Sequence, residues 1–289
     1  MKNILVATDF SVPAENAAHY AIQLAKLIKA NVMLCNAYKV PADAPMAAQV
    51  AWPLVNEEDM RSETGGSLTQ LVDKLSNVCS TDGFCPEITF ERKKGEVCQV
   101  IDRFVKQKEI ELVVMGMAGA GKLIQWALGS NSKTMIDGAE FPVLYVPGVA
   151  GFHGIKKIAF ASSLSVDELE PLEFLCKLAR PMDAEVVVYH ICGSELKRSE
   201  ELGGIDKDFY ENVVQKIDYK KIKYENIWHS DIHEGLRWIR NNNDIDIIAM
   251  VHQQHNLVDK LVNGSYTHKL SRFTTVPLLI FQPKNKVAK

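Results

Sequence analysis

Residues 112–119 read Leu-Val-Val-Met-Gly-Met-Ala-Gly, and Gly129-Ser130 follows after nine further residues. The apolar residues 112–115 predict a short buried strand. Gly116 and Gly119 would let main-chain N–H groups approach a ligand with no side chain between them. Ser130 is a favourable N-cap residue for a helix. Because a strand end, a glycine loop and a helix N-terminus together form an anion site, the stretch predicts a bound nucleotide or another phosphorylated ligand.

Two other interpretations of these glycines are weaker. Gly116 and Gly121-Lys122 approximate a P-loop, but the next residue is Leu123, whereas a P-loop needs Ser or Thr there to ligate Mg²⁺. The glycines could also serve only to permit a tight turn. Three glycines and a cap residue converging on one strand end favour the anion site.

The chain is an internal repeat. Residues 2–11 align with 156–165, and Gly129-Ser130 aligns with Gly264-Ser265. A chain of 289 residues is long enough for two domains of about 150 residues. We therefore expect one domain at 1–147 and a second at 155–283, joined by a glycine-rich linker.

Strand and helix patterns alternate in both halves. Apolar runs such as Ile247–Met250 suit parallel strands covered by helices on both faces. The predicted fold class is α/β, with two tandem doubly wound, Rossmann-like domains, each with a five-stranded and mainly parallel sheet. The expected strands are 3–8, 31–37, 86–91, 111–116, 142–146, 156–161, 184–191, 222–228, 245–250 and 276–281. The expected helices of the first half are 12–29, 57–79, 96–107 and 130–138.

Ligands of such sheets bind beyond the carboxyl ends of the strands, where Asp9 and Gly116 both fall. Asp9 could accept hydrogen bonds from ribose hydroxyls or the base, or it could cap the helix that begins near Val12. A main-chain group of Ala37, at the end of the second strand, could contact the adenine edge.

The second half departs from this pattern. Ser163 replaces the aspartate, and Val251 and Gln254 stand where the first two glycines would be. Their side chains would fill the space that phosphates need, so we expect this site to be non-binding or altered in its ligand. Ser165 and Glu168 form a capping-box pattern for the next helix.

A zinc site is one interpretation of the histidines in the second half. His252 and His255 lie in the altered loop, near the strand end that carries His190 and Cys192. Exposed loop histidines are the simpler interpretation. Residues 41–66 form the least regular segment, interpreted as a surface excursion or as a flap or partner-binding arm using Met46, Trp52 and Leu54.

Composition excludes several classes of function. The net charge is −3 without a basic stripe, which argues against nucleic acid as a partner. The apolar runs are far shorter than the ~20 residues of a membrane helix, and the first residues do not form a signal peptide. The six cysteines show no C-x-x-C pair, so we interpret them as reduced core residues of a cytoplasmic protein.

The motifs resemble the universal stress protein family. The resemblance rests on Val6-Ala7-Thr8-Asp9-Phe10-Ser11 and on Gly-x2-Gly-x9-Gly-Ser before a final Pro-Val-Leu strand, and it covers nearly the whole chain. It implies the ATP-binding branch, with Thr8 and Asp9 beside the nucleoside and Ala37 beside the adenine. It places five residues beside the phosphates: Gly116, Gly119, Gly129, Ser130 and Asn131.

The resemblance also implies a role and an assembly. It implies a cytoplasmic protein that acts in stress survival. Our leading hypothesis is that ATP, with or without Mg²⁺, binds as a conformational or partner-binding switch. A homodimer is one expected assembly, and an internal pairing of Val143–Val146 with Leu278–Phe281 is the other. Slow ATP hydrolysis and a scaffold that binds no nucleotide remain as alternatives.

Overall fold

The protein is described here from a computed structural model. The described residues are 2–38, 69–76, 83–117, 135, 139–192, 201–229, 232–242, 244–252 and 275–283, with the backbone alone for 201–206, 232–233 and 242.

Strands and helices alternate through the first half, as the sequence predicts. The elements in chain order are β1 (Asn3–Ala7), α1 (Val12–Ile28), β2 (Asn31–Tyr38), β3 (Ile88–Lys94), α3 (Val97–Gln107), β4 (Ile110–Met117) and β5 (Val143–Pro147). Residues 69–76 are helical, within the expected helix 57–79. The expected helix 130–138 and the segment 41–66 fall outside the described residues, apart from Met135.

The second half repeats this order with short 3-10 turns added. Its elements are β6 (Lys157–Ser162), η3 (Val166–Glu168), α5 (Leu169–Ala179), η4 (Arg180–Met182), β7 (Glu185–Cys192), α6 (Glu201–Asn212), η6 (Val214–Lys216), β8 (Ile222–Trp228), α7 (Ile232–Asn242), β9 (Ile247–Val251) and β10 (Leu278–Phe281).

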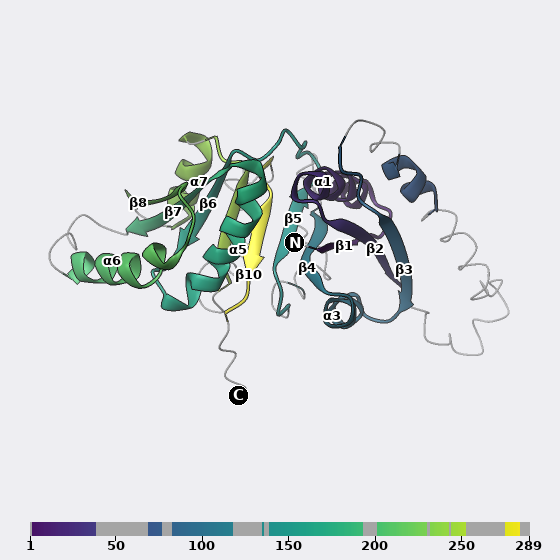
Figure 1. The fold of residues 1–289 in the computed structure, drawn as a ribbon, viewed down its shortest axis with the longest axis horizontal. Coiled ribbons are helices and arrows are strands. Elements are labelled where there is room, and N and C mark those ends of the chain that lie inside the picture. The colour runs from purple at the N-terminus through teal and green to yellow at the C-terminus, as the bar shows by residue number, and fades with distance from the viewer. Residues whose placement is uncertain are drawn as a thin grey trace, which may run out of the picture.

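The described strands form one continuous ten-stranded sheet in the order β3-β2-β1-β4-β5-β10-β9-β6-β7-β8 (Figure 1). Each half contributes five neighbouring strands that run parallel, which confirms the predicted fold class. The two halves meet where β10 pairs antiparallel with β5, with Leu279 opposite Leu144 and Ile280 opposite Val143. All four of these side chains are buried.

Helices cover both faces of the sheet, so the strands between the edge strands β3 and β8 bury side chains on both faces. One core includes Ile4 and Val6 of β1 together with residues of α1 and α5, and it continues into Phe160 of β6. The core on the other face joins Leu5 and Val113 to residues of α3 and α7. Each core crosses from one domain into the other, which accounts for the near absence of polar side chains along the central strands.

Helix α1 lies close to the sheet because its buried face is made of small residues. Ala17, Ala18, Ala21 and Ala25 are all fully buried. Ser11 caps the helix, and its hydroxyl accepts a hydrogen bond from the N–H of Ala14 at 3.4 Å. Lys29 ends the helix in the left-handed conformation, with a φ of 53°.

The segment after β5 packs across α1. The side-chain amide of Asn16 donates to the carbonyl oxygens of Pro147 at 2.9 Å and Ala150 at 3.0 Å. The ring of Phe152 meets the ring of Tyr20 edge to face, with centroids 4.9 Å apart. These contacts hold the linker between the domains against the first domain.

Candidate functional site

The carboxyl end of β1 turns sharply into α1 at Thr8. Thr8 is buried; its N–H donates to the carbonyl of Cys35 at 2.9 Å, and its hydroxyl oxygen accepts from the N–H of Phe10 at 3.1 Å. Phe10 adopts a left-handed φ of 64°, which reverses the chain. The turn ends strand pairing at Thr8 and brings the next residue to the surface of the sheet edge.

Asp9 lies at this turn with an exposed side chain. One carboxylate oxygen accepts a hydrogen bond from the N–H of Ser11 at 3.0 Å. Asp9 therefore orders the turn that presents Ser11, the cap of α1. An exposed carboxylate also keeps acceptor capacity for donors of a ligand, because an ionised carboxylate has about four acceptor positions.

The end of β2 is tied directly to the end of β1. Asn36 is buried, and its side-chain amide donates to the carbonyl oxygen of Thr8 at 2.9 Å. Ala37 follows in β2, half-buried and opposite Lys93 of β3. This hydrogen bond fixes the spacing between Thr8 and Ala37 at the same edge of the sheet.

Gly116 allows β4 to touch the first turn of α1 through main-chain atoms alone. A Cβ atom at Gly116 would lie 2.5 Å from the carbonyl carbon and oxygen of Pro13 and 2.7 Å from the nitrogen of Ala14. Such distances are far inside van der Waals contact, so no side chain fits. The structure therefore gives Gly116 a packing role, and its expected role beside a phosphate remains a prediction.

The described part of the predicted site comes together at one edge of the sheet. Ala7 lies opposite Cys35 on one side and Met115 on the other, so Thr8, Asn36 and Gly116 occupy the next level of three adjacent strands. Thr8, Asp9, Ala37 and Gly116 are thus neighbours. Gly119, Gly129, Ser130 and Asn131 lie outside the described residues.

The second domain repeats the turn with different side chains. Ser162 takes the place of Thr8, and its hydroxyl oxygen accepts from the N–H of Leu164 at 3.0 Å. Leu164 has a φ of 62°, matching Phe10. Ser165 caps the following turn and accepts from the N–H of Asp167 at 3.3 Å. The two halves therefore share one backbone design at this edge.

Glu168 distinguishes the second domain from the first. The Ser-x-x-Glu pattern assigned it only to a capping box and not to the sheet edge. Its side chain turns back to the strand end and accepts from the N–H and the hydroxyl of Ser163, both at 2.8 Å, and from the hydroxyl of Ser162. Only 2% of Glu168 is exposed. The capping-box interpretation placed a helix start correctly at Ser165, but the Glu168 carboxylate binds Ser162 and Ser163 instead of closing the box.

A signal for this carboxylate was present in the repeat. The alignment of residues 2–11 with 156–165 continues to place Glu168 opposite Ala14. An alanine replaced by a carboxylate just beyond the strand end is a large change of charge in the region where the first half is expected to hold phosphates.

The Gly116 position holds Val251 in the second domain. Ala161 lies opposite Met250 as Ala7 lies opposite Met115, so Val251 corresponds to Gly116. Val251 is buried, and the regular α-helix starts only at Leu169, after the 3-10 turn 166–168. At Gly116 the close approach of α1 leaves no room for a Cβ atom, whereas the second domain has a valine side chain at this position. Gln254 lies outside the described residues.

The histidine interpretations need one correction. His252 is 2% exposed, and its N–H donates to the carbonyl of Phe281 at 2.7 Å, so it is not an exposed loop histidine. A ring nitrogen of His190 lies 3.1 Å from the carbonyl oxygen of Ser162. Among the described residues, no three His, Cys, Asp or Glu side chains lie close enough to hold a metal ion. His255 lies outside the described residues.

The fold and the two matching sheet edges define a tandem Rossmann-like protein. The sequence profile of the Universal stress protein family matches residues 1–147. The chain therefore belongs to the universal stress protein family. Within the described ranges, no helix has the length and apolar character needed to cross a membrane.

Relatives extend over the whole chain. Universal stress protein Slr1230 of Synechocystis is 22% identical over 298 residues, which is 98% of this chain and 100% of that relative. Universal stress protein MJ0531 of Methanocaldococcus jannaschii is 30% identical over 145 residues, 50% of this chain and 81% of that relative. A solved universal stress protein from Archaeoglobus fulgidus shares the fold with a TM-score of 0.67 at 13% identity, covering 97% of this chain and 98% of that one.

The contact at Gly116 gives a stability prediction with a matched control. Gly116→Ala should lower the free energy of unfolding by about 1–3 kcal/mol, because the added methyl group overlaps main-chain atoms of α1. At Gly148 a Cβ atom would meet nothing nearer than 3.5 Å, from the side chain of Pro13, so Gly148→Ala should be close to neutral. Urea unfolding measures both, and equal losses would contradict the contact.

The buried carboxylate gives a pH prediction. Burial raises the pKa of Glu168 above its usual 4.5, although hydrogen bonds from Ser162 and Ser163 act in the opposite direction. A carboxyl whose pKa is higher in the folded state loses stabilisation as pH rises from its unfolded pKa through the folded one. Stability should therefore fall with rising pH above about 4.5, and this slope should be smaller in Glu168→Gln.

The control for this prediction is Glu173→Gln, which removes an exposed carboxylate from α5. Urea unfolding at a series of pH values compares the three proteins. An unchanged slope in Glu168→Gln, or the same change in Glu173→Gln, would show that Glu168 does not carry this pH dependence.

Proposed function

We propose that this universal stress protein binds ATP at one site, formed by the ends of β1, β2 and β4 in a first domain spanning 1–147. ATP would act as a bound ligand that changes conformation or partner binding in a cytoplasmic stress response. The second domain, 155–283, would hold a related site that has lost ATP binding. The observation that carries the proposal is the difference between the two sheet edges at Ala14 and Glu168.

Small side chains surround the turn in the first domain. Ala14, Ala37 and Gly116 contribute at most a methyl group each at the edge where Thr8 and Asp9 lie. Parallel α/β sheets bind their ligands beyond this edge. The exposed Asp9 carboxylate is an acceptor suited to ribose hydroxyls, and the half-buried Ala37 is suited to a flat adenine ring. These features support a nucleoside position beside β1 and β2.

The residues proposed to bind the phosphates of ATP lie outside the described residues. Gly119 and Gly129 would expose main-chain N–H groups, and Ser130 and Asn131 would begin a helix whose N-terminus attracts anions. Mg²⁺, when present, would be held mainly by phosphate oxygens, because Leu123 has no oxygen ligand to offer. The described residues fit the nucleoside half of ATP, and these four would supply the rest.

The second domain is unsuited to phosphate for an electrostatic reason. Glu168 already occupies the N–H and hydroxyl donors of Ser163. Wherever it is ionised, its carboxylate would repel a phosphate at this edge. Val251 adds side-chain volume at the position of Gly116. Both differences support a single competent site.

ATP binding and its location can be tested with paired glycine variants. Gly129→Val should abolish measurable ATP binding, whereas Gly264→Val, the equivalent change in the second half, should leave the affinity within twofold of wild type. Isothermal titration calorimetry measures each affinity. ATP at 100 times its Kd should add about 2.7 kcal/mol to the free energy of unfolding. Equal loss in both variants would refute the asymmetry.

Two further outcomes separate the remaining functions. Absence of adenine nucleotide after denaturing the purified protein, with no thermal shift on adding ATP, would indicate a scaffold instead. ADP formed in single-turnover assays and lost in Asp9→Ala would indicate slow hydrolysis at the first site. Size-exclusion chromatography with light scattering reports whether the chain also forms a homodimer.

A further inference from the structure

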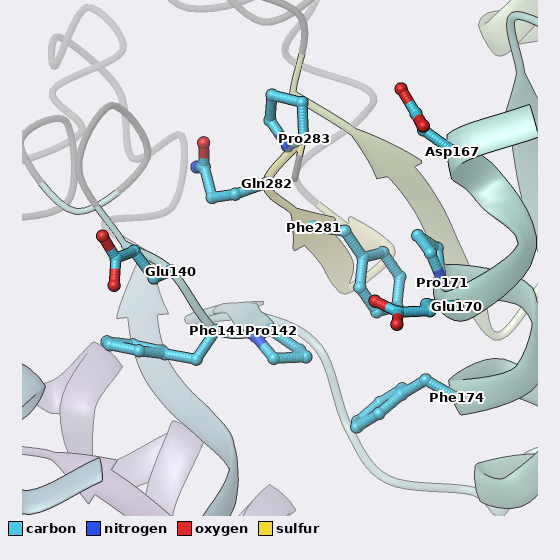
Figure 2. A pocket seen from close by; sticks show the side chains of 10 residues that line it. All are labelled: Glu140, Phe141, Pro142, Asp167, Glu170, Pro171, Phe174, Phe281, Gln282 and Pro283. Atoms are coloured by element: carbon cyan, nitrogen blue, oxygen red, sulfur yellow. The ribbon is translucent and has the colours of Figure 1, made fainter. Parts of the chain in front are cut away.

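A cavity of about 430 Å³ opens between the two domains (Figure 2). One wall is the segment 140–142, which leads into β5 of the first domain. The other walls come from the second domain, namely the end of β10 with Gln282 and Pro283, and the start of α5. The cavity is separate from the sheet edge proposed to bind ATP, because it lies beside β5 and β10.

The lining is apolar with an acidic rim. Phe141, Phe174 and Phe281 contribute aromatic rings, and Phe174 and Phe281 meet edge to face with centroids 5.5 Å apart. The charged residues of the lining are Glu140, Asp167 and Glu170, and no lysine, arginine or histidine is among them. Such a cavity fits an occupant with both an apolar side chain and positive charge.

The repeat shows what covers the equivalent surface in the first domain. Asn16 and Tyr20 of α1 correspond to Glu170 and Phe174 of α5, by continuation of the alignment of Lys2 with Lys156. There, the segment after β5 crosses the helix: Asn16 donates to two of its carbonyl oxygens, and Phe152 packs on Tyr20. The segment that follows the last strand, which begins with a turn at Gly148-Val149, thus fills this position.

The same repeat predicts the occupant in the second domain. Tyr145 corresponds to Ile280, because they lie opposite Met115 and Met250. Phe152 follows Tyr145 by seven positions, and Val287 follows Ile280 by seven. Val287 therefore corresponds to Phe152, and Lys284 and Lys286 precede it. Where the first domain uses the donor Asn16, the second has the acceptor Glu170, and the segment carries cations.

We propose that the segment 284–289 binds in this cavity, with Val287 against Phe174 and its lysines beside the carboxylates. Pro283 already lines the cavity, and four extended residues reach about 13 Å, enough to bring Val287 to α5. Because Glu140 and Phe141 belong to the first domain, the bound segment would connect both domains next to the β5–β10 pair. The proposal does not depend on ATP binding.

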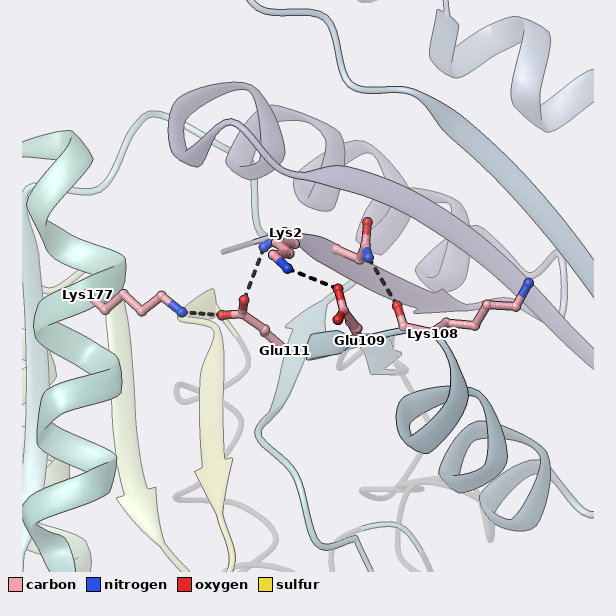
Figure 3. A network of polar contacts seen from close by, with 6 residues as sticks. Lys2, Lys108, Glu109, Glu111 and Lys177 are labelled. Atoms are coloured by element: carbon pink, nitrogen blue, oxygen red, sulfur yellow. Dashed lines mark hydrogen bonds and ion pairs between the residues drawn. The ribbon is translucent and has the colours of Figure 1, made fainter.

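Zero-length carbodiimide crosslinking of the full chain, followed by peptide mass spectrometry, tests the proposal. The reagent joins a lysine amine to a carboxylate that it contacts. The expected products join Lys284 or Lys286 to Glu140, Asp167 or Glu170. The ion pair of Lys177 with Glu111, 2.5 Å apart between the domains, is the internal positive control (Figure 3). Its crosslink without the expected ones would overturn the proposal.

Two variants and a labelled mixture complete the test. Val287→Asn should lower the crosslink yield roughly tenfold, because it removes the buried apolar contact. Val149→Asn, at a valine that is 66% exposed, should leave the yield unchanged. An unchanged yield in Val287→Asn would contradict the proposed placement. Crosslinks that combine ¹⁵N-labelled and unlabelled chains would show that a second copy fills the cavity, which would also overturn the proposal.

Discussion

The main-chain contact of β4 with α1 at Gly116 sets the geometry of the first domain's sheet edge. It brings the first turn of α1 against the end of β4 and thereby fixes where the β1–α1 turn can run. Two hydrogen bonds at Thr8 tie β1 to β2: its N–H donates to the carbonyl of Cys35, and its carbonyl accepts from the side-chain amide of Asn36. Asp9 follows at the surface, where its carboxylate accepts from the N–H of Ser11.

The second domain shows what happens when this contact is lost. Val251 stands in place of the glycine, the regular helix starts later, and the buried carboxyl group of Glu168 binds Ser162 and Ser163 at the strand end. The backbone turn is the same in both halves, with its left-handed Leu164, because it depends on a serine or threonine hydroxyl. The two halves therefore keep one fold and one turn while the side chains at the sheet edge differ in size and charge.

Much of this fold could be predicted from the sequence because its signals are local. Apolar runs located most of the described strands, and the match of residues 2–11 with 156–165 indicated a second copy of the fold. The role of Glu168 could not be read in the same way, because Ser-x-x-Glu describes both a capping box and a carboxylate that turns back to the preceding strand. Which of the two arrangements the Glu168 carboxylate adopts depends on how the surrounding fold buries it.

His252 was misjudged for a related reason. It follows β9 as expected, but it is buried and not exposed, because the backbone of β10 lies beside it and accepts its main-chain N–H. Contacts between residues far apart in sequence leave no periodic signal in a single chain. The packing role of Gly116 was likewise hidden, because a glycine required by a neighbouring helix and a glycine required by a ligand look alike in sequence.

Native mass spectrometry of the intact chain in excess ATP is the most direct measurement of the central claim. A single functional edge predicts a complex saturating at one ATP per chain. Saturation at two would show that Glu168 and Val251 do not close the second domain to nucleotide, and a spectrum of unliganded chain alone would contradict ATP binding altogether.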